Sequence, residues 1–387
     1  MTPRRRPGWS EGDSSWRSPE IVKESGVTRL GSITSVHPVI RAGSSQVNRT
    51  DARSFSGDDF WARNLRLGRN LSGAARVAKN VEISQPFRSG AYVAAYFVLW
   101  TLLLLLLRIL CHFDASEAIA AFLILALALP ALSLAATRRV PALPCVVLRP
   151  ACETTLLICY LAVIAAVLVW GFGAVGRISS EPAHTIISLG LKLAMFVVPP
   201  AVFLASGQYR LRDLAPVSFK RTALKPALWL SFAVLLMQMF LGRGLHDIRE
   251  AHLPAWVLVV AAPLSFAWLV IEVGVVEEFF FRALLQERLA AVLHSPWGGL
   301  VLGALLFGLA HAPGLYLRTA ATQESIGSHP SLLMAVGYSI VMTSLAGLFV
   351  GVLWLRTKNL AVVVIVHAAG DFLPNLVPWV KAFHLAR

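Results

Sequence analysis

The chain has 387 residues, of which 56% are hydrophobic and 14% are charged, and its formal net charge is +14. A soluble domain carries roughly 25% charged residues, so this composition excludes an ordinary soluble protein and indicates an integral membrane protein. Basic cytoplasmic loops and their attraction to the anionic lipid bilayer account for the positive charge, so no nucleic-acid partner is expected.

Residues 1–90 are rich in Ser, Arg, Gly and Asp and contain no sustained apolar run. Such a segment cannot bury enough apolar surface to offset the entropy lost on ordering, so we predict a disordered, basic cytoplasmic arm. Within residues 60–81 the apolar side chains recur on one helical face, and most basic ones lie elsewhere. This pattern predicts a helix that lies on the membrane surface.

Long apolar runs follow the arm and predict an all-α, polytopic membrane helix bundle of eight or nine transmembrane helices. Each run is close to the ~20 residues that cross a hydrocarbon core as a helix. The expected spans are 91–111, 117–136, 151–175, 184–205, 226–242, 254–281, 298–316, 332–355 and 360–380. We divide them into N-terminal transmembrane helices (91–250) and a core (251–380). Pro374 and Pro378 are expected to end or kink the last helix. Nine spans would leave the tail, with Lys381 and Arg387, outside, so eight spans remain the alternative.

The charges of the loops predict an orientation. Loops 137–150, 206–225 and 356–359 are basic, whereas loops 176–183 and 317–331 are balanced. The positive-inside rule therefore places the basic loops and the N-terminus in the cytoplasm. With no organelle-targeting segment, we expect a multi-pass protein of a bacterial inner (plasma) membrane.

Two adjacent glutamates, Glu277 and Glu278, lie inside an apolar run, and Arg282 follows them. Ionisable groups at membrane depth cost a few kcal/mol each on insertion scales, so they indicate a functional site. Because residues i and i+4 share a helical face, Glu278 and Arg282 are positioned to pair, and Glu277 is left free as a general base. The alternative is a structural salt bridge near the cytoplasmic helix end, beside a second acid that reaches the interface.

Three more polar groups lie in apolar segments downstream. His311 ends the sequence FGLAH, and His367 and Asp371 are i, i+4 partners in HAAGD. Gly370 is expected to allow another backbone to approach closely. A packed histidine and a His–Asp hydrogen bond between helices are the structural alternatives. We expect the three helices to converge on one cavity that opens to the cytoplasm.

Other features have simpler interpretations. Gly347 and Gly351 form a GxxxG pattern that is expected to pack helices. Lys192, Gln238 and Glu272 are polar residues in apolar runs, and the sequence indicates no partner for them.

The sequences EEFFFR, FGLAH and HAAGD resemble the EExxxR, FxxxH and HxxxN/D motifs of the CPBP family. That family comprises type II CAAX prenyl endopeptidases and bacteriocin-processing or Abi proteins, which are polytopic intramembrane proteases. The resemblance covers roughly residues 254–378. It implies that Glu277 and His311 activate a water for attack on a peptide carbonyl. His367 and Asp371 would stabilise the oxyanion, while Glu278 and Arg282 would hold the site together.

The last motif raises two questions. Eukaryotic members carry Asn where this chain has Asp371, and an ionised Asp cannot donate a hydrogen bond to an oxyanion. Asp371 must therefore be protonated, orient His367 or ligate a metal. Glu277, His311 and His367 could bind Zn²⁺ with an open position for water, although HExxH is absent and the family has also been interpreted as glutamate-dependent.

These observations predict a CAAX-protease-like intramembrane endopeptidase, of metalloprotease or glutamate type, acting on membrane protein or peptide substrates. A non-catalytic membrane scaffold or immunity protein and a proton-coupled transporter are the alternatives. Neither the substrate nor the oligomeric state follows from the sequence.

Overall fold

The computed structural model of the chain describes residues 86–206, 209–317, 326 and 330–385. All regular secondary structure in these residues is helical, as predicted. Nine of the described helices are long and apolar enough to cross a membrane. The chain is thus an integral, multi-pass membrane protein. Residues 1–85 of the predicted arm, with its surface helix at 60–81, lie outside the described residues, whereas residues 86–90 already belong to the helix Pro86–Cys111.

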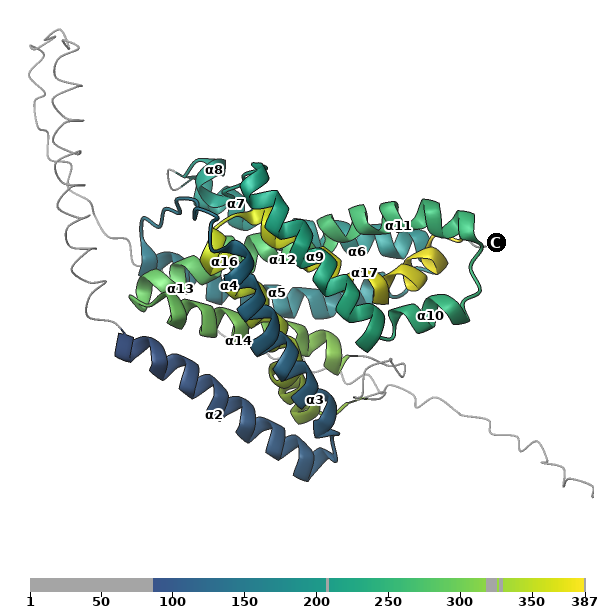
Figure 1. Cartoon of the computed structure of the whole chain (residues 1–387), viewed down its shortest axis with the longest axis horizontal. Helices are drawn as coiled ribbons and strands as arrows, with labels where there is room; N and C mark the ends of the chain where they lie inside the picture. The colour runs from purple at the N-terminus through teal and green to yellow at the C-terminus, as the bar shows by residue number, and fades with distance from the viewer. Residues whose placement is uncertain (1–85, 207–208, 318–325, 327–329, 386–387) are drawn as a thin grey trace, which may run out of the picture. The chain divides into compact units, whose positions relative to one another are not determined.

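The first five candidate spans lie between Gly90 and Leu241 (Figure 1). They are built by α2 (Pro86–Cys111), α3 and α4 (Ala115–Ala121, Leu129–Thr137), α5 (Pro150–Val175), α6 and α7 (Glu181–Phe196, Val198–Ser206) and α9 (Arg221–Leu241). The last four are built by α11 to α13 (Ala255–Leu269, Val276–Glu278, Glu287–Val292), α14 (Pro296–Tyr316), α15 and α16 (Leu332–Tyr338, Ser344–Thr357) and α17 (Leu360–Ala382). Two short helices, α8 (Leu211–Leu214) and α10 (Gly244–Glu250), lie between spans.

The helix that carries the two glutamates is longer than predicted. It is continuous from Ala255 to Val292, 38 residues, or about 57 Å at 1.5 Å per residue, against a hydrocarbon core of ~30 Å. Residues 279–286 are all buried within the protein, so this part packs against other helices rather than lipid. Two π-helical segments, Val270–Val275 and Phe279–Gln286, flank the glutamates in α12.

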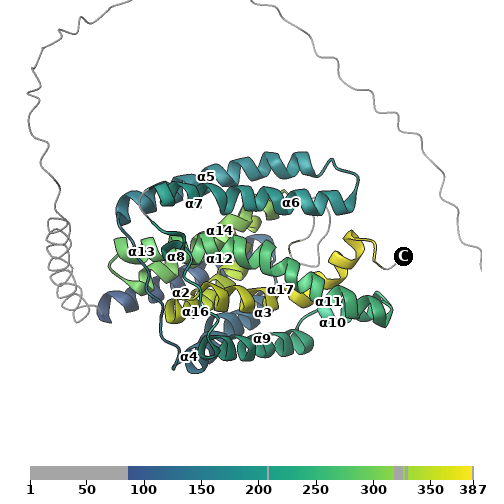
Figure 2. The ribbon, with the colours of Figure 1, turned by 90° about the horizontal axis from the view of Figure 1, so that it is seen from above.

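The centre of the bundle is formed by α14, α16 and α17. Helix α16 packs on α14, and α17 packs on α9 and α11, as Figure 2 shows from above. The GxxxG prediction is confirmed, because a Cβ at Gly347 would lie 3.1 Å from the Cα of Ala304 on α14. Figure 2 also shows α5 and α6 side by side along one edge of the described helices.

Of the two expectations for Pro374 and Pro378, an end of the helix is ruled out, because α17 continues past both prolines and completes the ninth candidate span. The turns around these prolines are held by apolar packing. Leu376 and Val380 are buried in one cluster with Val257 and Ala261 of α11.

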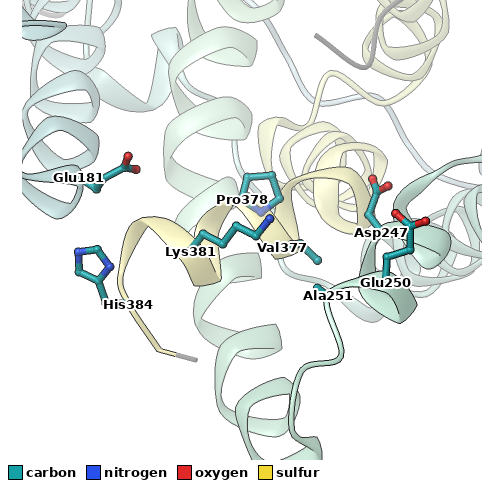
Figure 3. Close-up of a pocket in the computed structure, with 8 residues that line it drawn as sticks. All are labelled: Glu181, Asp247, Glu250, Ala251, Val377, Pro378, Lys381 and His384. Atoms are coloured by element: carbon teal, nitrogen blue, oxygen red, sulfur yellow. The ribbon is translucent and has the colours of Figure 1, made fainter. Parts of the chain in front are cut away.

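The loops that share a charge type meet at the same end of the bundle. Among the basic loops, the backbone N–H of Leu143 donates to the carbonyl of Thr357 at 3.1 Å, and that of Leu360 donates to Pro216 at 2.9 Å. At other helix ends, Glu181, Asp247 and Lys381 line one pocket of about 680 Å³. Figure 3 shows Lys381 between Glu181 on one side and Asp247 on the other. This grouping agrees with the alternation of sides that the loop charges predict.

Candidate active site

Glu278 joins two helices in the buried interior. Its carboxylate accepts a hydrogen bond from Nε of Arg282 at 3.0 Å and another from Nδ1 of His367 at 2.6 Å. Glu278 and Arg282 are fully buried. The pair predicted from the i, i+4 spacing is present, and the bond to α17 is an additional contact that spacing along one helix could not reveal.

Phe307, the first residue of FGLAH, lies among the three motifs. The guanidinium carbon of Arg282 is 4.6 Å from the centre of its ring. The rings of His311 and His367 lie 4.9 Å and 6.1 Å from it, centroid to centroid. An aromatic face attracts a cation and gives the imidazoles a rigid neighbour. Phe307 is therefore a positioning residue of the site that the sequence analysis did not single out.

A cavity of about 1040 Å³ lies beside this buried connection and is lined by Glu277, His311 and Asp371. Glu277 makes no hydrogen bond or ion pair with any residue that the structure describes. His311 places Nδ1 2.8 Å from the carbonyl of Phe307. Because a carbonyl only accepts, Nδ1 carries a proton, and Nε2 is the nitrogen left to act on a ligand in the cavity.

The six predicted residues fall into two groups. Glu277, His311 and Asp371 line the cavity, whereas Glu278, Arg282 and His367 form the buried connection behind it. His367 is only 8% exposed, and its Nε2 lies 3.8 Å from Oδ2 of Asp371. That distance is too long for a hydrogen bond but allows the charges to interact.

The close approach expected at Gly370 is wrong. A Cβ at Gly370 would meet no described atom within 4 Å, and its carbonyl instead accepts a hydrogen bond from Gln238 of α9. The helices of Glu278 and His367 come together at Gly274, where a Cβ would lie 2.7 Å from Cγ1 of Val364. This contact is three residues before both Glu277 and His367, so it sets the spacing at the site.

The lining of the cavity also includes an ion pair between two residues for which the sequence indicated no partner. Nζ of Lys192 on α6 lies 2.8 Å from Oε1 of Glu272, and both residues line the cavity. The indole N–H of Trp268 donates to the same carboxylate. A cation in an apolar span is thereby paired, as membrane depth requires.

The cavity reaches the helix ends that lie opposite the basic loops. Its lining includes His184 in the first turn of α6 and Leu317 directly after α14. These residues adjoin loops 176–183 and 317–331, which the charge pattern assigns to the non-cytoplasmic side. The sequence predicted both a cytoplasmic opening of the cavity and cytoplasmic basic loops. The structure is compatible with one of these two predictions but not with both. The reason is that Glu277 lies well inside a 38-residue helix, not near the end of a shorter one.

The arrangement does not fit the zinc ligand set considered above. In the described part of the chain, no three His, Cys, Asp or Glu side chains lie together in a group that could hold a metal ion.

Comparison with known protein families is consistent with this geometry. Residues 254–373 match the family model described as type II CAAX prenyl endopeptidase, Rce1-like. All six candidate residues lie inside the matched segment, and α2 to α10 lie before it. Comparisons with curated proteins and with solved structures gave no match. The segment 254–373 is thus similar to the Rce1-like family of type II CAAX prenyl endopeptidases.

Proposed function

We propose that the protein is an intramembrane endopeptidase that hydrolyses peptide bonds of membrane-associated proteins or peptides. The observation that carries this proposal is a cavity among candidate membrane spans whose lining includes both Glu277, a carboxylate with no partner among the described residues, and the oriented imidazole of His311. A carboxylate without a partner suits a general base, and the similarity of the matched segment to a protease family supports the same reaction class.

In this proposal Glu277, assisted by Nε2 of His311, accepts a proton from a water molecule. The water oxygen bonds to the peptide carbonyl carbon, and the carbonyl electron pair moves onto its oxygen. Asp371, when protonated, stabilises that oxyanion by donating a hydrogen bond, and His367 acts behind it, with Nε2 3.8 Å from Oδ2 of Asp371. Collapse of the tetrahedral intermediate breaks the C–N bond, and the leaving amine takes the proton from Glu277. Glu278 and Arg282 act by holding the ring of His367 in place.

The test uses the purified protein in liposomes with a quenched fluorescent peptide library, offered in free and lipid-anchored forms. We expect cleavage by the wild type and a loss of about 10²–10⁴-fold in Glu277→Gln at unchanged folded yield. Glu181→Gln is the matched control, because Glu181 lines a different pocket (Figure 3), and it should cleave at the wild-type rate. Equal cleavage by Glu277→Gln would remove this residue from the mechanism.

The same preparations separate the alternatives. A scaffold or immunity protein would show no cleavage and would keep its cellular phenotype in Glu277→Gln, while a transporter would show ion-coupled flux into the liposomes. Zinc content of the active protein distinguishes the two protease types. Stoichiometric zinc whose removal abolishes cleavage would replace the mechanism above with a metal-dependent one.

A further inference from the structure

A polar face of α6 runs along the cavity, on a helix outside the segment that matches the family. His184, Ser188 and Lys192 follow one another at intervals of four residues, and all three line the cavity. Residues with this spacing share one face of a helix. Ile186 and Ile187 of the same helix are exposed on its outer surface. Helix α6 therefore turns its polar side chains towards the cavity of Glu277.

Ser188 has an unused hydrogen-bonding group in this wall. It is 8% exposed, and its hydroxyl has no partner among the residues that the structure describes. Thr185 on the same helix donates to the carbonyl of Glu181 at 2.9 Å, the common solution for a helical hydroxyl. Leaving a buried hydroxyl unpaired is unfavourable, so the unpaired hydroxyl of Ser188 indicates that a hydrogen-bonding partner enters the cavity.

Three other buried hydroxyls also lack a partner within the described residues, namely those of Ser133, Thr154 and Ser265. None of these three is among the residues that line the cavity, whereas Ser188 is. The combination of an unpaired hydroxyl and a cavity wall is therefore specific to Ser188.

Lys192 supplies further donors one turn along the same face. Its ammonium has three N–H groups, and one of them donates to Glu272, whose carboxylate is also held by Trp268. The side chain is 26% exposed, so its remaining N–H groups can reach an acceptor in the cavity.

We propose that Ser188 and Lys192 bind main-chain carbonyl groups of the peptide substrate, so that the peptide lies extended along α6. This inference rests on the proposed function. Both residues donate, and peptide carbonyls accept. Glu272 and Glu277 outnumber Lys192 among the charged residues of the lining, which disfavours an anionic ligand. Four residues of helix span about 6 Å, close to the roughly 6.6 Å between alternate carbonyls of an extended chain.

The first test measures KM and kcat for the library peptide that the wild type cleaves fastest. We expect Ser188→Ala to raise KM about threefold to tenfold with kcat unchanged, the result of losing one hydrogen bond that is equally strong in ground and transition states. Ser265→Ala is the matched control, since it removes a buried, unpaired hydroxyl that does not line the cavity. It should leave KM and kcat unchanged.

The second test removes the Lys192 donor without leaving a buried charge alone. In Lys192→Met combined with Glu272→Gln, we expect KM to rise about tenfold while the melting temperature stays within a few degrees of wild type. A role for the ion pair in folding alone would change the melting temperature and leave KM as it was.

Equilibrium binding of the same fluorescent peptides to Glu277→Gln requires no turnover and keeps the two proposals apart. Adding Ser188→Ala to Glu277→Gln should weaken binding by the same factor as the rise in KM. Unchanged KM and unchanged binding in both sets of variants would overturn the role of α6 and leave the protease proposal intact. Ser188-dependent binding without any cleavage by the wild type would overturn the protease proposal alone.

Discussion

The carboxylate of Glu278 carries two bonds, one to Arg282 of its own helix and one to His367 of α17. Arg282→Ala would leave this fully buried carboxylate with one partner, at a cost of about 3–5 kcal/mol. We therefore expect a lower folded yield and a lower melting temperature in detergent. Arg282→Lys should rescue only part of the loss, because Lys lacks the planar guanidinium that lies over Phe307. An unchanged melting temperature in the alanine variant would show that the pair does not stabilise the fold.

Asp371 can be tested by a substitution that keeps its shape. Asn supplies an N–H donor at nearly the same place and does not ionise, so Asp371→Asn should stay active to higher pH than the wild type. The wild type would lose its donor once Asp371 ionises. A pH–activity profile of both proteins measures this. An inactive Asn variant that also holds less metal than wild type would instead make Asp371 a metal ligand.

At this scale the sequence predicted contacts within one helix better than contacts between helices. The i, i+4 spacing was sufficient for the Glu278–Arg282 pair, because helix geometry alone brings these residues together. The bond from Glu278 to His367 and the pair of Lys192 with Glu272 span 89 and 80 residues of sequence. Their formation depends on which helices pack together, and no local pattern encodes that.

Among the elements, the contact between Gly274 and Val364 controls how closely the helix of the glutamates approaches α17. An alanine at 274 would place its Cβ 2.7 Å from the side chain and 3.0 Å from the backbone oxygen of Val364. The helices must then separate, which lengthens the Glu278–His367 bond. We expect Gly274→Ala to lower kcat at least tenfold, since misplacing a catalytic group by about 1 Å costs up to 10²-fold.

The matched control for this variant is Gly190→Ala on α6, where an added Cβ meets no described atom within 4 Å. It should leave kcat at the wild-type value, because the added methyl group meets no neighbour. The melting temperature should stay equal or rise slightly, because alanine favours a helix more than glycine does. Wild-type activity in Gly274→Ala would show that the helix spacing is not critical for the reaction.

The positions of the spans followed from the sequence because length and apolar character identify a membrane helix. The extent of the sixth span did not, since hydropathy cannot distinguish a residue that faces lipid from one buried in protein. Arg282, Gln286 and Arg288 interrupt the apolar run, yet they lie buried inside the bundle on a helix that continues to Val292. The two π-helical segments around the glutamates likewise left no sequence pattern that we recognised.

For the whole molecule, the separation of loops by charge and the position of the cavity together predict the side from which substrate enters. The basic loops meet at one end of the bundle, and the cavity reaches the helix ends near His184 and Leu317. If the basic loops face the cytoplasm, as the positive-inside rule requires, the cavity opens on the opposite side. Substrates would then be cleaved at the outer half of the membrane.

Single cysteines in a background without the four native ones test this orientation. Leu317→Cys reports the cavity end and Arg139→Cys the basic loops, and both positions are exposed. An impermeant maleimide added to right-side-out vesicles should label Leu317→Cys and leave Arg139→Cys unlabelled, with the reverse pattern in inside-out vesicles. Labelling of Arg139→Cys from outside would reverse the inferred orientation and place the basic loops on the non-cytoplasmic side. The cavity would then open to the cytoplasm, and the loop charges of this chain would be an exception to the positive-inside rule.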